Sequence, residues 1–326
     1  MTTLTEATGT TAARETPARR RRVDYLPYVL LLPCLAIIAV LLLWPLGQVV
    51  MMSFHKLNNV RQLRGDREWP WVGLDNYAQI LGDPFFRTVL RNTVLFAMAN
   101  VALTMILGTL VGLLLNRLGK RMATFVASCV MLAWATPALT GTIVWKWIFD
   151  DTSGLVTWLF NKLPDGLSTA LFGRSDWTGY GWFNDPLLFF AILTLVVVWH
   201  SFPFIAVSVL AGLKSVPSEL QEAARVDGAG PWRVFWSVTF PTLRPVFGIL
   251  VVLSTIWDFK VFTQQFVLAG GTQDRSTFML SIYSYAEAFS PPPKYGLGSA
   301  IAVILTLILL AVTALYVRMV LRQEES

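Results

Sequence analysis

Charge is scarce in this sequence. Charged residues make up 14% of its 326 residues, whereas a soluble domain usually carries about 25%. Hydrophobic residues make up 55%. So few charged side chains are atypical of a soluble domain, and the composition therefore predicts an integral membrane protein.

Cysteine and histidine are also scarce. The two cysteines, Cys34 and Cys129, lie in apolar runs and form no C-x-x-C pair, so we interpret both as packing residues. The two histidines, His55 and His200, are isolated from each other. Because a histidine-based metal site needs several ligands at close spacing, we expect no metal site in this chain.

The sequence contains no G-x-x-x-x-G-K-[ST] phosphate loop. A chain without this loop cannot hold the phosphates of ATP through it. We therefore expect that the chain binds no cofactor, and that a partner supplies the energy if the chain carries out active transport. We also expect no nucleic-acid partner.

What the sequence does contain is a set of long apolar stretches, each close to the 20 residues that cross a bilayer as a helix. Six spans are predicted, near residues 28–50, 93–115, 122–145, 186–213, 240–262 and 297–317. Residues 1–24 are polar and lack the apolar core of a signal peptide, which predicts a disordered cytoplasmic tail. The prediction is an all-α membrane domain over residues 25–322, followed by a short cytoplasmic tail at 323–326.

The charge distribution gives the orientation of these spans. An even number of spans that begins inside places both termini in the cytoplasm. In that orientation, 14 of the 26 Lys and Arg residues and eight of the 20 Asp and Glu residues lie inside. Twelve basic and twelve acidic residues remain outside, so the whole net charge of +6 is cytoplasmic. This distribution agrees with the positive-inside rule.

Two spans carry local features of helix packing. Gly108 and Gly112 form a G-x-x-x-G pair, which permits close approach of a second helix. Pro137 and Gly141 interrupt the third span. An interruption of this kind either lines a pathway or is a packing kink, and the sequence favours neither.

The fifth span is too short to cross the bilayer unless it includes charged residues. Only thirteen uncharged residues separate Arg244 from Asp258, so Asp258 and Lys260 lie in or near the outer half of the membrane. One interpretation is a helix that lines a solute path; the other is a pair at the outer interface with Lys260 snorkelling to water. On the first interpretation, the candidate path residues are Trp199, Trp257, Asp258, Lys260 and Phe262.

Between the fourth and fifth spans lies a polar segment that predicts two short amphipathic helices. Ser218 is expected to cap the first, with Gln221 returning the capping bond, and Gly228 to end it. Pro231 is expected to open the second and Pro241 to end it. Their apolar stripes are Leu220, Ala223 and Ala224, and then Trp232, Phe235 and Trp236. From the pattern alone, this segment could be a hairpin that lies on a bilayer.

The order of residues in this segment adds a resemblance. Glu222, Ala223, Ala224, Asp227, Gly228 and Ala229, followed by Phe235, Pro241 and Pro245, resemble the EAA loop of permease subunits of binding-protein-dependent ABC importers. Residues 73–77 resemble a segment of the same permease family, and residues 267–272, 288–289 and 295–300 are similar to landmarks of its carbohydrate-uptake class, the maltose and glycerol-phosphate permeases. Thr272 stands where a proline is usual in that class.

The resemblance implies a type I ABC importer permease fold with six transmembrane helices in a bacterial-type inner membrane. It implies that the chain is not itself an enzyme, and that two cytoplasmic ATPase subunits use ATP and Mg²⁺. A second related permease, usually forming a heterodimer, and an extracytoplasmic solute-binding protein complete the importer. The implied solute is a sugar, an oligosaccharide or a related polyol, moved by alternating access.

The same resemblance assigns roles within a cytoplasmic coupling loop at residues 214–241. Glu222 is expected to make polar contact with the ATPase, Ala223 and Ala224 to pack closely against it, and Gly228 to form the turn between the two short helices. The stripe from Trp232 to Trp236 is left open, since it could contact either the ATPase or the chain's own helices.

Three alternatives remain at this stage. The same machinery could carry another solute, such as a polyamine or a phosphorylated polyol. The chain could be an ion-coupled secondary transporter with Asp258 and Lys260 as its relay. A membrane-embedded enzyme using Asp150 and Asp151 is disfavoured, because no further carboxylate or histidine cluster accompanies this pair.

Overall fold

A computed structural model describes residues 26–271 and 274–324. The tail predicted at residues 1–24 lies outside the described residues. The described chain is helical, apart from one isolated antiparallel bridge between His55 and Trp71. It divides into two compact units, Met1–Gly47 and Gln48–Ser326.

The first unit contains α1 (Leu26–Ile38), the π-helical turn η1 (Ala39–Leu43) and the start of α2 (Trp44–Ser53). From Val29 to Leu46 its large apolar side chains are exposed; Leu30, for example, is 70% exposed and Leu41 66%. A helix that is apolar on every side is suited to lipid contact. Residues Val29–Ser53 are long and apolar enough to cross a membrane.

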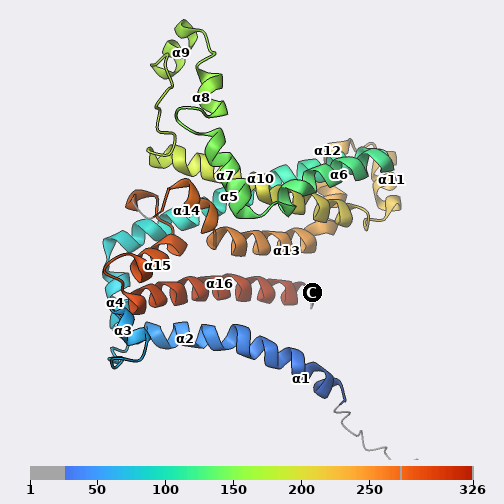
Figure 1. Ribbon diagram of the computed structural model, residues 1–326. Helices are drawn as coiled ribbons and strands as arrows, with labels where there is room; N and C mark the ends of the chain where they lie inside the picture. Colours follow the sequence, from blue (N-terminus) through green and yellow to red (C-terminus); the bar gives the residue numbers. More distant parts are fainter. Residues whose placement is uncertain (1–25, 272–273, 325–326) are drawn as a thin grey trace, which may run out of the picture. The chain divides into compact units, whose positions relative to one another are not determined.

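Long helices form the second unit (Figure 1). They are α5 (Pro84–Arg117), α6 (Lys120–Ala135), α7 (Ala138–Ile148), α10 (Pro186–Leu213), α13 (Phe240–Phe259) and α16 (Tyr295–Glu324). In the described residues, five stretches are long and apolar enough to span a membrane, and α6 with α7 forms a sixth if this bent pair is one span. The bend between α6 and α7 is 92°.

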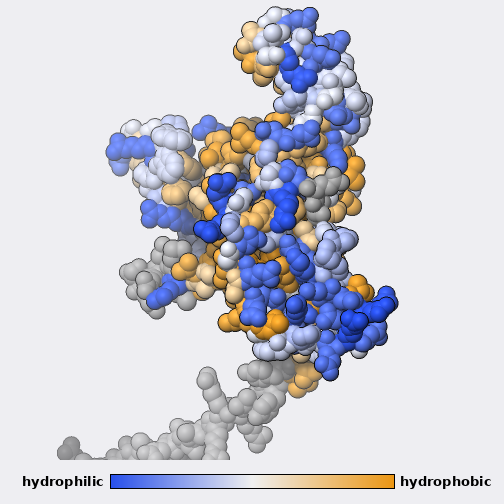
Figure 2. Space-filling view, turned by 90° about the vertical axis from the view of Figure 1, so that its left-hand side faces the viewer, coloured by the Kyte–Doolittle hydropathy of each residue, from blue (hydrophilic) through white to orange (hydrophobic). Residues whose placement is uncertain are grey.

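Short helices connect these elements. They are α3 (Val60–Leu63), α4 (Asp75–Gly82), α8 (Leu155–Phe160), α9 (Asp165–Phe172), α11 (Ser218–Val226), α12 (Pro231–Val234), α14 (Thr263–Leu268) and α15 (Leu280–Phe289), with the π-helical turn η2 (Phe235–Thr239) and the 3₁₀ turn η3 (Arg275–Thr277). Figure 1 shows α8 and α9 extending away from the long helices. Figure 2 shows hydrophilic residues gathered, among apolar ones, over the end of the second unit where α4 and α15 lie.

The G-x-x-x-G pair of α5 marks its closest contact with α10. A Cβ atom on Gly108 would lie 2.6 Å from Cβ of Ile205, and one on Gly112 would lie 2.9 Å from the carbonyl oxygen of Ala206. Both distances are too short for any residue larger than glycine. The close helix crossing that this pair permits is therefore present in the structure.

The landmark at residues 73–77 has a structural role. The Asn76 side-chain amide donates hydrogen bonds to the carbonyl oxygens of Ser53 at 2.8 Å and His55 at 3.1 Å. The hydroxyls of Tyr77 and Ser53 lie 2.7 Å apart. This segment therefore satisfies backbone groups left free where α2 ends.

The landmarks at residues 288–289 and 295–300 pack against each other. A Cβ atom on Gly298 would lie 2.6 Å from Cβ of Ala288, so this glycine lets α16 lie directly on α15. The backbone N–H of Gly296 donates to the carbonyl oxygen of Leu57 at 3.3 Å. Close packing thus accounts for the small residues in these two landmarks.

Two expectations for the segment before α13 are wrong. Ser218 does not cap α11: Pro217, with ψ of 129°, is the N-cap residue, and Ser218 is the first residue of the helix. Pro241 does not end a helix either. The chain continues from α12 through the π turn η2 into α13, where Pro241 lies in the first turn. The wide π turn tolerates a residue that has no N–H to donate.

Candidate functional site

The turn after α11 is fixed by its backbone. Gly228 has φ of +81°, and its N–H donates to the carbonyl oxygen of Arg225 at 3.0 Å. The next N–H, from Ala229, donates to the carbonyl oxygen of Ala224 at 2.9 Å. These two bonds form a complete Schellman motif. The prediction that Gly228 makes the turn between the two short helices is borne out by this geometry.

The side chains of α11 divide between two faces. Leu220, Glu222 and Ala223 are exposed, and Val226 is 87% exposed. Ala224 is half-buried on the side of its own chain. The stripe predicted to form one face is therefore split: Leu220 and Ala223 are free for a partner, whereas Ala224 is partly covered.

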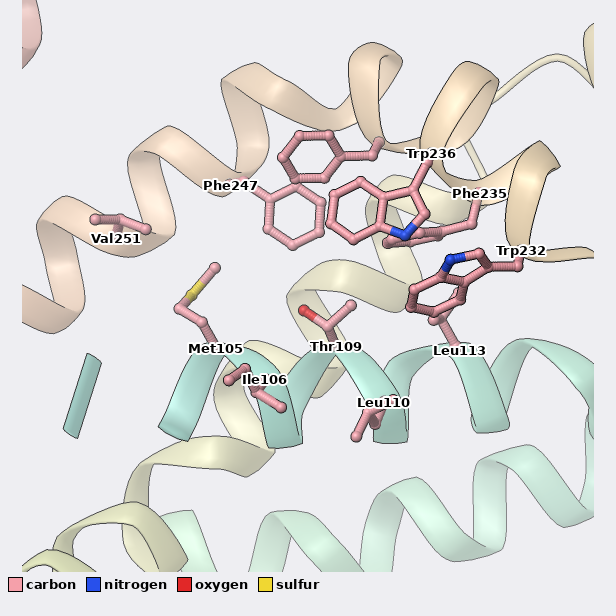
Figure 3. Close-up of a pocket in the computed structure, with 11 residues that line it drawn as sticks. Met105, Ile106, Thr109, Leu110, Leu113, Trp232, Phe235, Trp236, Phe247 and Val251 are labelled. Atoms are coloured by element: carbon pink, nitrogen blue, oxygen red, sulfur yellow. The ribbon is translucent and has the colours of Figure 1, made fainter. Parts of the chain in front are cut away.

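The aromatic stripe beyond the turn lies over the chain's own helix α5. Trp232, Phe235 and Trp236 contact one another, with ring centroids 5.2 to 6.3 Å apart. Together with α5 and α13 they enclose an apolar groove of about 390 Å³. Figure 3 shows the three rings above Thr109 and Leu113 of α5. Contact with the chain's own helices, one of the two alternatives left open for this stripe, is therefore present in the structure.

A second, more polar pocket lies among α6, α10, α13 and α14. Its volume is about 420 Å³. It combines two indole rings with a carboxylate, an ammonium, an imidazole, a hydroxyl and an amide. The lining residues are Trp134, Val197, His200, Ser201, Trp257, Asp258, Lys260, Val261 and Gln264.

Asp258 is the unusual member of this pocket. It is 3% exposed, yet among the described residues its carboxylate has no hydrogen-bond or ion-pair partner. Lys260 is exposed and forms no ion pair with it within the same residues. A buried carboxylate normally has a partner, and one that lines a pocket without any is available to an incoming polar group.

Sequence reasoning placed five residues in a candidate path, and the structure brings three of them together. Trp257, Asp258 and Lys260 line the polar pocket. Trp199 lies instead against Trp145, with ring centroids 5.8 Å apart. Phe262 stacks on the ring of Phe266, 5.3 Å away. Neither Trp199 nor Phe262 lines the pocket.

His200 is a pocket residue that sequence reasoning missed. Its Nε2 lies 3.0 Å from the carbonyl oxygen of Thr136, and a carbonyl can only accept, so we assign the proton to Nε2. Thr136 is the C-cap residue of α6, directly at the 92° bend. The imidazole thus satisfies a backbone group that the bend frees. The only signal in the sequence was a lone histidine inside an apolar span.

Lys146 was also missed. Its ammonium donates a hydrogen bond to the carbonyl oxygen of Val267, in the last turn of α14, at 2.8 Å. A cation at the C-terminal end of a helix is favourable because it satisfies free carbonyl groups and opposes the helix dipole. This bond connects α7, the second half of the bent pair, to the segment that follows Lys260.

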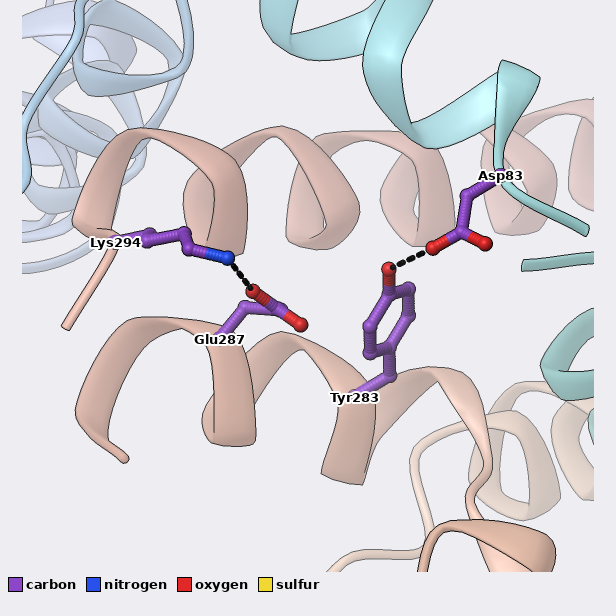
Figure 4. A network of polar contacts seen from close by, with 4 residues as sticks. All are labelled: Asp83, Tyr283, Glu287 and Lys294. Atoms are coloured by element: carbon purple, nitrogen blue, oxygen red, sulfur yellow. Dashed lines mark hydrogen bonds and ion pairs between the residues drawn. The ribbon is translucent and has the colours of Figure 1, made fainter. Parts of the chain in front are cut away.

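Two polar contacts hold the elements around α15 (Figure 4). Tyr283 donates a hydrogen bond to the Asp83 carboxylate at 3.5 Å, and Lys294 forms an ion pair with Glu287 at 3.2 Å. Asp83 also caps α5, since its carboxylate accepts from the N–H of Phe85 at 2.8 Å. The first contact fastens α15 to the start of α5, and the ion pair fastens α15 to the residue that precedes α16.

Asp150 is occupied by its own turn. One carboxylate oxygen accepts hydrogen bonds from the N–H and hydroxyl groups of both Thr152 and Ser153, at 2.8 to 3.0 Å. These bonds, the Ser153 N–H first among them, lower the pKa of Asp150 to about 2. Within the described part of the chain, no three His, Cys, Asp or Glu residues are grouped as metal ligands.

Comparisons with known proteins agree with this arrangement. The model of the family described as "Binding-protein-dependent transport system inner membrane component" matches residues 104–324. The diacetylchitobiose uptake system permease protein DasB of Streptomyces coelicolor is 41% identical over 98% of this chain and 93% of its own length. The trehalose/maltose transport system permease protein MalF of Thermococcus litoralis is 30% identical over 90% of this chain and 92% of its own.

A solved structure has the same fold. The crystal structure of a bacterial ABC transporter involved in the import of the acidic polysaccharide alginate includes a chain that matches with a TM-score of 0.73. The match covers 92% of this chain and 96% of that chain at 19% identity. A likeness at this identity shows the fold, and the fold class predicted from the sequence is confirmed.

Proposed function

The chain belongs to the family of binding-protein-dependent transport system inner membrane components, and we propose that it is the membrane subunit of an ATP-driven importer for a sugar or short oligosaccharide. The observation that carries the proposal is the polar pocket around Asp258. A sugar presents hydroxyl groups around its ring and apolar C–H faces above and below it. The pocket offers hydrogen-bonding groups together with the indoles of Trp134 and Trp257.

The relatives support this class of solute. The names of three of them refer to diacetylchitobiose, sulfoquinovosyl glycerol and trehalose or maltose, all of which carry a sugar ring. Because the first of these is 41% identical over 98% of this chain, a di- or oligosaccharide is the solute class that we propose. In the importer, the solute arrives from an extracytoplasmic binding protein and crosses by alternating access.

The exposed face of α11 supports a separate ATPase. This chain has no phosphate loop, so two cytoplasmic ATPase subunits would use ATP and Mg²⁺. Glu222 and Ala223 are free to contact such a partner. Gly228, with Asp227 and Ala229 beside it, would transmit the partner's motion, because the Schellman motif gives the turn one defined geometry. Ala224, which is half-buried, would pack α11 against the rest of its own chain.

A second permease subunit would complete the pathway, and a heterodimer of related permeases is the arrangement that we propose. The complex would lie in a bacterial-type inner membrane with both termini of this chain in the cytoplasm. The charge balance supports this orientation, since the outer segments are neutral and the inner ones carry the full +6.

The experiment is an uptake assay in cells that lack this gene and are complemented with variants of it. The probes are radiolabelled diacetylchitobiose, trehalose and maltose. We expect complementation to restore ATP-dependent uptake of at least one probe, and Trp257→Ala to abolish it. Trp147→Ala, at a position that is 60% exposed, is the matched control and should transport normally. Uptake driven by a proton gradient after ATP depletion would overturn the proposal in favour of a secondary transporter.

A further inference from the structure

The apolar groove beneath the aromatic stripe is open, and no further segment of residues 26–271 and 274–324 fills it. Ten of its eleven lining residues are apolar, and Thr109 is the exception. Helix α5 contributes Met105, Ile106, Thr109, Leu110 and Leu113, and the α12–η2–α13 segment contributes the rest, including Trp232, Phe235 and Trp236. Figure 3 shows these two walls facing each other.

One end of the groove adjoins a cationic pocket of about 340 Å³. The two cavities share Leu113, Trp232 and Phe235. The adjoining pocket adds the side chains of Arg117 and Arg225. Among the described residues, neither guanidinium has an ion-pair or hydrogen-bond partner. An apolar channel therefore leads directly to two unpaired positive charges.

Trp232 lies where these two environments meet, and Trp236 lies beside it in the groove. Trp232 is 72% exposed and Trp236 is 48% exposed, and neither indole N–H has an acceptor within the described residues. Tryptophan is enriched at membrane–water interfaces, where its ring contacts acyl chains and its N–H reaches polar groups. The apolar groove, the tryptophan indoles and the cationic pocket thus lie in the same order as the acyl chain, the interfacial region and the head group of a phospholipid.

We propose that this composite cavity is a binding site for an anionic phospholipid. One acyl chain would occupy the groove between α5 and the α12–η2–α13 segment, and the phosphate would contact Arg117 and Arg225. The groove walls belong to two stretches that are apolar and long enough to span a membrane, so acyl chains are the medium around them. The two guanidiniums select a lipid with a net negative charge.

Occupancy would connect the bilayer to the turn at Gly228. Arg225 is on α11, Arg117 ends α5, and Trp232 follows the turn. A lipid held by all three would fasten α11 and α12 to α5. The site lies behind the exposed face of α11, so an ATPase bound there would meet a segment whose position depends on the lipid.

The test is lipid retention by the intact transport complex, with all its subunits, measured by native mass spectrometry. The probes are phosphatidylglycerol and phosphatidylcholine with the same acyl chains. We expect the complex to retain phosphatidylglycerol preferentially. The double variant Arg117→Gln/Arg225→Gln should weaken this retention by about 25-fold, since each of the two cations contributes a factor of about five to the binding of an anionic lipid.

The matched control is Lys120→Gln/Arg121→Gln, which removes the same charge near the end of α5 without altering a residue of either cavity. Equal loss in both double variants would overturn the site in favour of a general attraction to the basic surface. No preference for phosphatidylglycerol in the unmodified complex would overturn it as well.

A second measurement tests the acyl chain separately. Phosphatidylglycerol with brominated acyl chains quenches nearby indole fluorescence, and the part of the quenching that is lost in Trp232→Phe/Trp236→Phe reports on the groove. We expect that part to be substantial in the intact complex. Its absence would show that another subunit, and not lipid, covers the groove. Neither measurement uses solute uptake, so failure of this site and failure of the proposed transport function are distinguishable.

Discussion

His200 Nε2 lies 3.0 Å from the carbonyl oxygen of Thr136, across 64 positions of sequence. Replacing His200 with alanine would leave this partly buried carbonyl without its partner at the bend between α6 and α7, and the loss of one such hydrogen bond costs about 0.5–1.5 kcal/mol. We expect His200→Ala to lower the unfolding temperature of the purified chain and to reduce uptake. His200→Gln retains a donor and should recover much of the stability. Unchanged unfolding in the alanine variant would contradict this role.

Gly228 is the residue of the coupling loop with the strictest backbone requirement. Its φ of +81° costs a residue with a Cβ about 1–2 kcal/mol, and a β-branched residue more. We expect Gly228→Val to insert normally into the membrane but to lose solute uptake, together with any stimulation of ATP hydrolysis by the loaded binding protein.

Gly230→Ala is the control for this variant. Gly230 has φ of −67°, and a Cβ atom there would meet nothing within 4 Å. This variant should transport at the normal rate. If Gly228→Val transported equally well, the proposed role of the turn in coupling would be wrong.

The sequence predicted the elements whose cause is local. Apolar length predicts the long helices, and the spacing of Gly108 and Gly112 marks the face on which α10 packs. Gly228 was recognised because only a residue without a Cβ adopts its φ readily. Each of these features depends on residues close together in the chain.

Features that depend on distant partners could not be predicted in the same way. Pro137 and Gly141 indicated an interruption, but the 92° bend is stabilised by His200, which belongs to another span. Pro241 is tolerated because the chain forms a π turn before it. Phe262 lies only two residues beyond Lys260, yet its ring contacts Phe266 and Tyr285 and not the pocket.

The contact between α5 and α10 should be intolerant of side chains. A Cβ atom on Gly108 would overlap Ile205. Gly108 belongs to α5 and Ile205 to α10, and these two helices pack against each other. We expect Gly108→Val to destabilise the chain by about 1–3 kcal/mol or more, because overpacking forces the helices apart. Gly119→Ala, in open space, is the control. Thermal unfolding in detergent measures both, and equal midpoints would contradict the close contact.

The turn at Asp150 should weaken in acid. Because the folded-state pKa is lowered from 3.8 to about 2, the carboxylate stabilises the turn fully above pH 3.8. This contribution is lost as the pH falls toward 2. A ¹³C titration of the Asp150 carboxyl should therefore give a midpoint near 2. A midpoint near 3.8 would show that the four hydrogen bonds do not form in solution.

Replacing Asp258 separates the two interpretations of Asp258 and Lys260. If the polar pocket is part of the solute path, Asp258→Asn replaces the carboxyl group that a solute would meet with an amide of the same size. We expect this variant to raise the KM for uptake by about tenfold, the loss of roughly 1.4 kcal/mol of binding, because a buried polar group left without its hydrogen-bond partner costs about 1–3 kcal/mol.

Asp151→Asn is the control, since Asp151 is exposed in the turn after α7 and should give unmodified kinetics. The double variant Asp258→Asn/Lys260→Gln completes the comparison. Because the two side chains form no ion pair with each other, removing both charges should not rescue the single variant. If Asp258→Asn had normal KM and kcat, Asp258 and Lys260 would instead lie at the outer membrane interface. Their replacement would then affect insertion of the chain into the membrane and not transport.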